Sequence, residues 1–419
     1  MIGLLLAAVL LALSSLSAPL RAQEPPAVDP SDIVNTLLGG LLGFKDITGP
    51  ELQTEVAEVG GVPFRSDVPL RYLTRAELSR YLKEVLDDEY PPAQARADQK
   101  TLVAFGLLDP GIDLRAVRAR LLEENVAGFY DERPGKKQLY AVSEDRRLTP
   151  TNQLILSHEL RHALQDQYAS VHDVIPSSVG DFDDRRIAFL SLLEGDATLV
   201  MERFLLRRIP GVEESELSGL SMPIPAVPGA PPVLADQLVL PYVVGRDFAR
   251  AVWQRGGWDA IKAAWSRPPE SSEQVLHPEK FFARESPQRV EITYAPAGGT
   301  LVNEGVLGEM LTRTLLGEGS DAAAAGWGGD RFRVWDVGGR SLLVWRSVWD
   351  SPMDLAEFKP ALLGRLAAER TPAGERGPFR IFARPPWRFA AGEVAGGMVL
   401  VSSDDDRAFD AAVAALARP

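Results

Sequence analysis

Residues 149–168 read TPTNQLILSHELRHALQDQY, and this stretch decides how the chain is interpreted. Thr149 is a favourable N-cap residue, and Pro150 suits the first helical position because the N–H that proline lacks would be unpaired there anyway. The stretch therefore predicts one helix running almost to its end. His158 and His162 are one turn apart on this helix, so both imidazoles can face the same metal ion.

Glu159 stands between the two histidines and is turned about 100° from His158 around the helix. A carboxylate beside a metal ion, but not bound to it, can take a proton from metal-activated water. The pattern His-Glu-x-x-His therefore predicts a zinc (Zn2+) site in which Glu159 is the general base. The alternative is an amphipathic helix whose histidines merely face a polar interior.

A zinc ion of this kind needs a third protein ligand and one position left for water. The chain has no cysteine and four histidines, so the third ligand is expected to be a histidine or a carboxylate. His172 is one candidate, but the metzincin arrangement is excluded because Gln165 and Tyr168 occupy its glycine and histidine positions. Three acids before the next helix are further candidates, although N-capping is the commoner role of such residues: Asp181, Asp183 and Asp184.

Glu194 is the favoured third ligand. It lies with Asp196 in Phe189–Ala197, an otherwise apolar helical stretch that is expected to continue to about Leu206. A buried carboxylate is costly unless it is paired or bound to a metal, which favours a liganding role. Gly195 and Ala197 are expected to let the backbone approach the histidine helix closely. The alternative is a helix edge with a solvated Glu–Asp pair.

The rest of the chain predicts an α+β fold, and a length of 419 residues predicts roughly two or three domains. Apolar residues at helical spacing predict short helices before the histidine helix: Arg75–Asp88, Ala93–Leu108 and Leu114–Asn125. Two short strands, Gly128–Tyr130 and Gln138–Val142, flank a turn at Pro134-Gly135. The site region is therefore expected to be mostly helical, with a small sheet at its edge.

From about Val290 the pattern changes to that of a small α+β domain with no histidine and no metal-ligand cluster. Residues alternating around Gly338-Gly339 predict a hairpin, and Ser351 is expected to begin a helix. The expected elements are strands at Phe332–Val337, Ser341–Val348, Phe379–Ala383 and Met398–Ser402, and a final helix at Asp404–Leu416. Substrate docking, partner contact and covering the catalytic region are the open roles for this domain.

The first 22 residues predict a secretory signal peptide. An apolar run from Ile2 to Leu13 is followed by small residues and by Leu20-Arg21-Ala22. No Lys or Arg precedes the run, so the alternative is an uncleaved N-terminal membrane anchor. In either case the protein is expected to be exported, to the periplasm or out of the cell. A net charge of −13 argues against a nucleic-acid partner.

These motifs together resemble a known family. His158-Glu159-x-x-His162, followed by Glu194 on the next long helix, resembles the gluzincin zinc peptidases of the thermolysin-like clan. Three longer strings resemble a largely uncharacterised group of bacterial exported proteins: HELRHALQDQ at 158–167, LEGDAT at 193–198 and SEQVLHPEK at 272–280. The resemblance implies that the two histidines and Glu194 bind zinc and that Glu159 is the general base. It also implies that the segment Phe129–Val142 contains the edge strand that receives an extended substrate.

The chain departs from the thermolysin pattern at the residue that orients a histidine ligand. That family carries an Asp four residues after the third ligand, where this chain has Thr198. Asp196 and Asp166 are the two acids left open for the role, because metal-bound imidazoles usually donate their other N–H to an acceptor.

A donor for the developing oxyanion is also expected at such a site. The candidates for this donor are His277, in the string SEQVLHPEK at 272–280, and the tyrosines Tyr168 and Tyr242. The alternative role for His277 is to cap a helix end.

The sequence thus predicts a signal peptide (1–22), an N-terminal helical region (23–127), a zinc-binding catalytic region (128–287) and a C-terminal α+β domain (288–419). The expected function is an exported zinc metallopeptidase that hydrolyses peptide or protein substrates. The alternative is a catalytically silent, exported metal-binding or scaffold protein whose C-terminal domain recognises a partner. The presence of Glu159 favours the first function, and nothing in the sequence indicates the oligomeric state.

Overall fold

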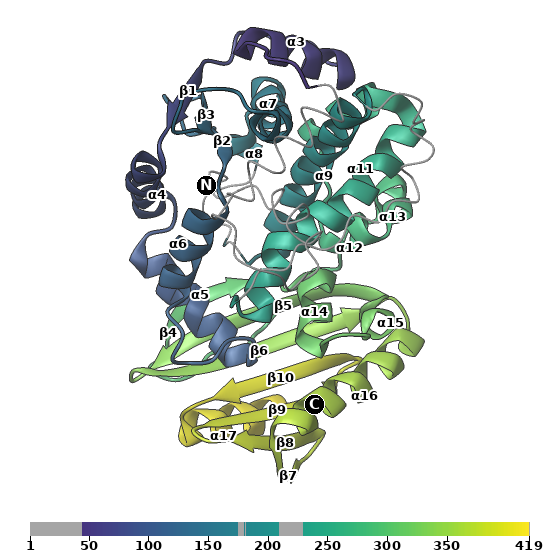
Figure 1. The fold of residues 1–419 in the computed structure, drawn as a ribbon. Coiled ribbons are helices and arrows are strands. Elements are labelled where there is room, and N and C mark those ends of the chain that lie inside the picture. The colour runs from purple at the N-terminus through teal and green to yellow at the C-terminus, as the bar shows by residue number, and fades with distance from the viewer. Residues whose placement is uncertain (1–43, 175–179, 181, 209–228, 419) are drawn as a thin grey trace, which may run out of the picture.

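A computed structural model describes residues 44–174, 180, 182–208 and 229–418 (Figure 1). The predicted signal peptide lies outside the described residues. A mainly helical part lies above a seven-stranded antiparallel sheet, and the expectation of an α+β fold is confirmed. Within the described ranges, no helix combines the length and the apolar character needed to cross a bilayer.

The N-terminal region is helical, as predicted. The three expected helices are α4 (Arg75–Glu89), α5 (Pro92–Phe105) and α6 (Leu114–Asn125). A further helix that was not predicted, α3 (Gly49–Val59), begins with a capping box between Thr48 and Glu51.

A small three-stranded sheet lies beside the histidine helix. The predicted strands are present as β2 (Gly128–Asp131) and β3 (Gln138–Val142), which pair antiparallel. The third strand, β1 (Leu70–Leu73), was not predicted and pairs parallel with β3. The order β1-β3-β2 leaves β2 at an edge of the sheet, facing the histidine helix.

The histidine helix is α7 (Pro150–Ala169). Its start agrees with the prediction, because Thr149 accepts the N–H of Asn152 in a capping box and Pro150 is the first helical residue. Residues 151–166 are all buried, so α7 is surrounded by the rest of the protein. A short helix, α8 (Val171–Val174), follows it.

Glu194 lies in α9 (Asp184–Leu206), which packs between α7 and the long α11 (Pro232–Ser266). The expected role of Gly195 was wrong in one respect, because this glycine faces α11 and not α7. A Cβ added to Gly195 would lie 1.9 Å from the carbonyl oxygen of Gly245. The physical reason is helical: neighbouring residues point about 100° apart, so Gly195 turns away from α7 when Glu194 faces it.

The C-terminal part is a seven-stranded antiparallel sheet with the order β4-β5-β6-β10-β9-β8-β7. The predicted hairpin around Gly338-Gly339 is confirmed, and Ser351 caps the helix that follows it. The strands are β4 (Thr300–Gly305), β5 (Trp327–Val337), β6 (Arg340–Trp349), β7 (Thr371–Arg376), β8 (Phe379–Arg384), β9 (Trp387–Val394) and β10 (Gly397–Ser403). The helices are α14 (Gly308–Leu316), α15 (Asp321–Ala324), α16 (Pro352–Glu369) and α17 (Asp406–Leu416).

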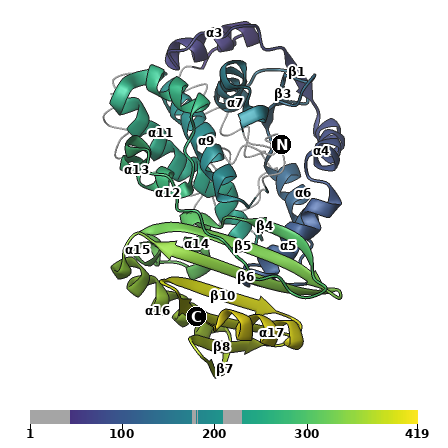
Figure 2. The ribbon, with the colours of Figure 1, turned by 180° about the vertical axis from the view of Figure 1, so that it is seen from behind.

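Successive side chains of β6 point to opposite faces of the sheet and pack into two separate layers of hydrophobic core. Leu343 and Trp345 pack towards α5 and α16, whereas Leu342 and Val344 pack towards α17 on the opposite face. Figure 2 shows α17 against the C-terminal strands from behind.

Helix α5 joins the N-terminal region to the C-terminal sheet. Phe105 packs edge-on against Phe332 and Trp345, with ring centroids 5.7 and 6.0 Å apart. One hydrophobic core therefore runs from the N-terminal helices into the sheet, across the predicted boundaries at 127/128 and 287/288.

Candidate metal centre

Three predicted ligands converge at the contact between α7 and α9. The Nε2 atom of His158 lies 2.9 Å from Oε2 of Glu194 and 3.0 Å from Nε2 of His162. The distance from His162 Nε2 to the same Glu194 oxygen is 3.5 Å. All three side chains are buried, with Glu194 fully inaccessible.

This donor set fits a zinc ion. Zinc–ligand distances of about 2.0–2.2 Å in a tetrahedral site place neighbouring donor atoms about 3.4 Å apart. The three distances between donor atoms lie close to that value, so a small outward movement of the side chains suffices. The second carboxylate oxygen of Glu194, Oε1, is buried and has no hydrogen-bond partner within the described part of the chain. Two imidazoles and one carboxylate are a common protein ligand set for catalytic zinc.

The charges at the centre are set by burial and by the mutual contacts. Burial opposes ionisation of Glu194, but the two histidines outweigh this effect and lower its pKa to about 2. Burial also disfavours a charged His162, and the neighbouring Glu194 overcomes that effect and raises the pKa of His162 to about 9. For His158 burial dominates and lowers the pKa. Glu194 is therefore an anion, which is the form that binds a cation.

Glu159 lies next to the three converging side chains but is held separately. The main-chain N–H of Tyr130, on the edge strand β2, donates to Oε2 of Glu159 at 3.0 Å. The other oxygen, Oε1, is buried without a partner among the described residues. Burial raises the pKa of Glu159 to about 8. With this pKa the group is mostly protonated at neutral pH, and a cation bound by the three converging side chains would favour the carboxylate, which is the form that accepts a proton.

A small cavity opens between Glu159 and His162. Its walls also include Tyr130 of β2 and Leu193 of α9. The cavity measures about 10 Å³, which is close to the lower limit for one water molecule. The position lies between the predicted general base and one predicted ligand, where the predicted mechanism needs a water molecule.

Asp166 and Asp196 were the two candidates for orienting a histidine ligand, and neither contacts a histidine directly. Asp166 accepts hydrogen bonds from the Tyr130 hydroxyl and from Lys137. Asp196 binds Arg161, and the side chain that meets the His162 ring is Gln165, with Oε1 at 2.9 Å from Nδ1. From the sequence, Gln165 served only to exclude the metzincin arrangement, although its position one turn after His162 is a signal for this contact.

His277 is not brought to the converging ligands. It joins α12 (Ser272–Leu276) to α13 (Pro278–Ala283), and its Nε2 lies 3.1 Å from both oxygens of Glu309 on α14. The hydrogen bond to Glu309 raises the pKa of His277, and the other charges that act on it come from Arg313 and Glu279. His277 therefore links the site region to the C-terminal part through Glu309.

The two tyrosines that were eligible as oxyanion donors differ in position. The hydroxyl of Tyr168 donates to the carbonyl of Pro63, and Arg65 covers its ring. Tyr242 of α11 stacks on His158, with ring centroids 5.8 Å apart and planes at 19°. Its hydroxyl is buried near Glu194, and no hydrogen bond of good geometry to it is present in the described ranges. Tyr242 is therefore the tyrosine that lies at the centre.

Of the other third-ligand candidates, Asp183 and Asp184 take no part in the group. Asp183 is the N-cap of α9 and accepts the N–H of Arg185, which is the capping role that the sequence favours. Asp184 accepts the main-chain N–H of Ser272. Asp181 lies outside the described residues. His172 lies in α8, and its side chain is also outside the described part.

A second acidic group among the described residues is an ion-pair cluster. The ammonium group of Lys280 lies 2.7 Å from Glu273 and 2.8 Å from Glu285, and it also contacts Asp350. Because Lys280 already supplies the positive charge, these acids need no metal ion. The string at 272–280 thus ties the site region to the C-terminal part.

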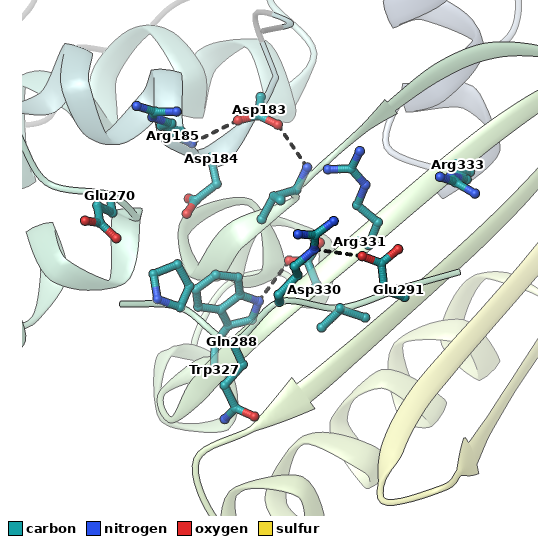
Figure 3. Close-up of a pocket in the computed structure, with 14 residues that line it drawn as sticks. Asp183, Asp184, Arg185, Glu270, Gln288, Glu291, Trp327, Asp330, Arg331 and Arg333 are labelled. Carbon is teal, nitrogen blue, oxygen red and sulfur yellow. Dashed lines mark hydrogen bonds and ion pairs between the residues drawn. The ribbon is translucent and has the colours of Figure 1, made fainter. Parts of the chain in front are cut away.

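A larger pocket of about 460 Å³ lies where α9 begins beside β5 (Figure 3). Its lining carries both signs of charge, including Asp183, Arg185 and Arg331. None of the converging ligands lines it.

Comparison with known proteins covers only the C-terminal part. A family model described as a domain of unknown function (DUF8575) matches residues 295–415. No curated protein and no solved structure matches the chain. The matched region contains all strands of the large sheet and none of the converging ligands.

Proposed function

We propose that the protein is an exported, zinc-dependent metallopeptidase that hydrolyses peptide bonds in peptide or protein substrates. The observation that carries the proposal is the convergence of His158, His162 and Glu194 with Glu159 beside them. Residues from two helices, separated by more than thirty positions, meet in a buried setting that would be costly without a cation.

Zinc held by these three side chains would polarise a substrate carbonyl and make a bound water more acidic. Glu159 then supplies the base. Its Oε2 is held by Tyr130, so Oε1 is the oxygen that takes the proton from water and later returns it to the leaving amine.

Tyr242 completes the proposed site. Its ring is fixed against His158, and its protonated hydroxyl lies near Glu194 without a well-formed hydrogen bond to any side chain in the described part of the chain. A donor of this kind stabilises negative charge that develops on the substrate oxygen. Burial and the neighbouring Glu194 and Glu159 raise the pKa of Tyr242, so the hydroxyl keeps its proton at neutral pH.

The burial of the centre favours one alternative, a metal-binding protein without turnover. His158 is 1% exposed, and the adjacent cavity is close to the minimum for one water molecule. A polypeptide substrate would need the surrounding elements to move apart. The position of Glu159 favours the peptidase, because a purely structural metal site needs no unbound carboxylate at that place.

Two measurements test the proposal. Zinc content, determined by mass spectrometry on the full-length protein, is expected to be close to one ion per chain. Glu194→Gln should lose the ion, whereas Glu202→Gln should retain it. Glu202 is a matched control because it lies on the same helix and pairs with Arg246 and Arg250. Equal zinc content in all three proteins, or none in the wild type, would overturn the metal site.

Turnover of a mixed peptide library separates the two functions. The wild type is expected to cleave peptides, and Glu159→Gln is expected to keep zinc but lose cleavage. A Glu159→Gln protein that cleaves as fast as the wild type would remove Glu159 from the mechanism. A wild type that binds zinc and cleaves nothing would favour the alternative function.

A further inference from the structure

We infer that Gln165 is a positioning residue that fixes the orientation of His162 and the nitrogen on which it carries a proton, and that Asp196 and Arg161 hold Gln165 in this role. The inference rests on the proposed metal site. It concerns residues of α7 and α9 that support a predicted ligand and are not themselves predicted ligands.

The orientation of the Gln165 amide is fixed by its own acceptors. Its Nε2 group donates to the carbonyl oxygen of Leu193 at 3.0 Å and to Oδ2 of Asp196 at 2.8 Å. Both partners only accept hydrogen bonds, so the NH2 group must face them and the amide oxygen must face the other way. That oxygen lies 2.9 Å from Nδ1 of His162.

The consequence for His162 is chemical. Because an amide oxygen only accepts, Nδ1 must carry the hydrogen that is donated to it. The lone pair available to a metal ion is then on Nε2, which is the nitrogen that faces His158 and Glu194. An imidazole with the opposite tautomer would present an N–H to the ion.

Asp196 is engaged by donors other than a histidine. It accepts from Arg161 through both oxygens, at 2.8 and 2.9 Å, and from the indole N–H of Trp265 at 3.0 Å, in addition to Gln165. Arg161 is itself fully buried between the rings of Trp258 and Trp265. The ion pair therefore holds α7 against α9. The Gln165 amide, which is hydrogen-bonded to Asp196, in turn holds the His162 ring in place.

The arrangement requires an amide and not a carboxylate at position 165. A glutamate there would have no N–H for Leu193 or Asp196 and would place two carboxylates in contact. Both effects are unfavourable in a buried setting. If position 165 needed only an acceptor for the His162 N–H, a carboxylate there would make the histidine more basic and would strengthen zinc binding. The two explanations thus predict changes of opposite sign for Gln165→Glu.

The test measures zinc affinity of the full-length protein by competition with a chelator. Gln165→Glu and the nearly isosteric Gln165→Met are both expected to weaken zinc binding about 10- to 100-fold. The matched controls are Gln153→Glu and Gln153→Met, which should leave the affinity unchanged. Gln153 is buried on the same helix and donates to the carbonyls of Lys45 and Leu148.

The outcomes are distinguishable. Unchanged or tighter zinc binding in Gln165→Glu would overturn the inference, and so would unchanged binding in Gln165→Met if the glutamate variant does not fold. Equal losses at positions 153 and 165 would also overturn it, because the effect would then be general destabilisation. The absorption spectrum of the Co2+-loaded protein should change in the Gln165 variants alone. A wild type that binds no zinc would instead refute the proposed function.

Discussion

Replacing Gly195 with alanine would place a methyl group against the main chain of α11. The added Cβ would lie 1.9 Å from the carbonyl oxygen of Gly245 and 2.0 Å from its carbonyl carbon. Ordinary contact begins at 3.4 Å, so the two helices must separate by the difference between 3.4 and 1.9 Å, about 1.5 Å. Neither side can yield by rotating a side chain. We therefore expect a loss near the upper end of overpacking effects, about 3 kcal/mol.

The same movement would reach the proposed metal centre. Glu194 is the neighbouring residue, and the crossing of α9 and α11 helps to set its distance from His158, which is 2.9 Å. Zinc affinity is therefore expected to fall together with stability. Denaturant unfolding of the zinc-free protein measures the first effect, and chelator competition measures the second.

Gly364→Ala is the matched control. Gly364 lies within α16, and no heavy atom lies within 4 Å of a Cβ built on it. Alanine there should stabilise the helix by up to about 1 kcal/mol and leave zinc binding unchanged. If Gly195→Ala unfolds at the same denaturant concentration as the wild type, α9 and α11 do not cross at this glycine pair and the reasoning fails.

Three further changes test other contacts. Tyr242→Phe keeps the ring on His158 but removes the hydroxyl, so kcat is expected to fall about 100- to 1000-fold with zinc content unchanged; steady-state kinetics that show the wild-type kcat would contradict this role. Lys280→Met leaves the buried Glu273 without its counter-charge and should cost about 3 kcal/mol in chemical unfolding, most of it restored in the double variant with Glu273→Gln; no restoration would argue against the ion pair. Burial raises the pKa of Asp330 to about 6 from 3.8, so the folded state keeps a proton that the unfolded chain has already released, and stability falls as the pH rises through that interval. Asp330→Asn should remove about 1.4 kcal/mol per pH unit of this slope between pH 4 and 6, and urea titrations with the wild-type slope would refute it.

The helix that carries the histidines could be predicted from sequence because its signals are local. Thr149 and Pro150 mark its start, and the spacing of His158 and His162 puts both on one face whatever surrounds them. Glu194 was identifiable because a carboxylate in an apolar helix needs a partner. The identity of these side chains could therefore be predicted from patterns within each helix.

Contacts that depend on distant packing could not be predicted in this way. Glu309, the partner of His277, lies on a helix of the C-terminal part, so the sequence around His277 gives no sign of it. Gln165 has no charge to mark it, and its role depends on Asp196 from another helix. Strand β7 has every residue exposed and contains Pro372 and Gly374, so it lacks the alternation by which strands are recognised.

The packing of Phe105 on the large sheet has a consequence for how the chain can be divided. The segment that matches the family model begins at residue 295 and lacks α5, which covers one face of its strands. Expressed alone, that fragment would lose the contacts of Phe332 and Trp345 with Phe105, and the apolar surface exposed there would favour aggregation. Helix α5 and the C-terminal strands thus share one hydrophobic core. A destabilising substitution in α5 is therefore expected to destabilise strands β5 and β6, which lie more than two hundred residues later in the chain.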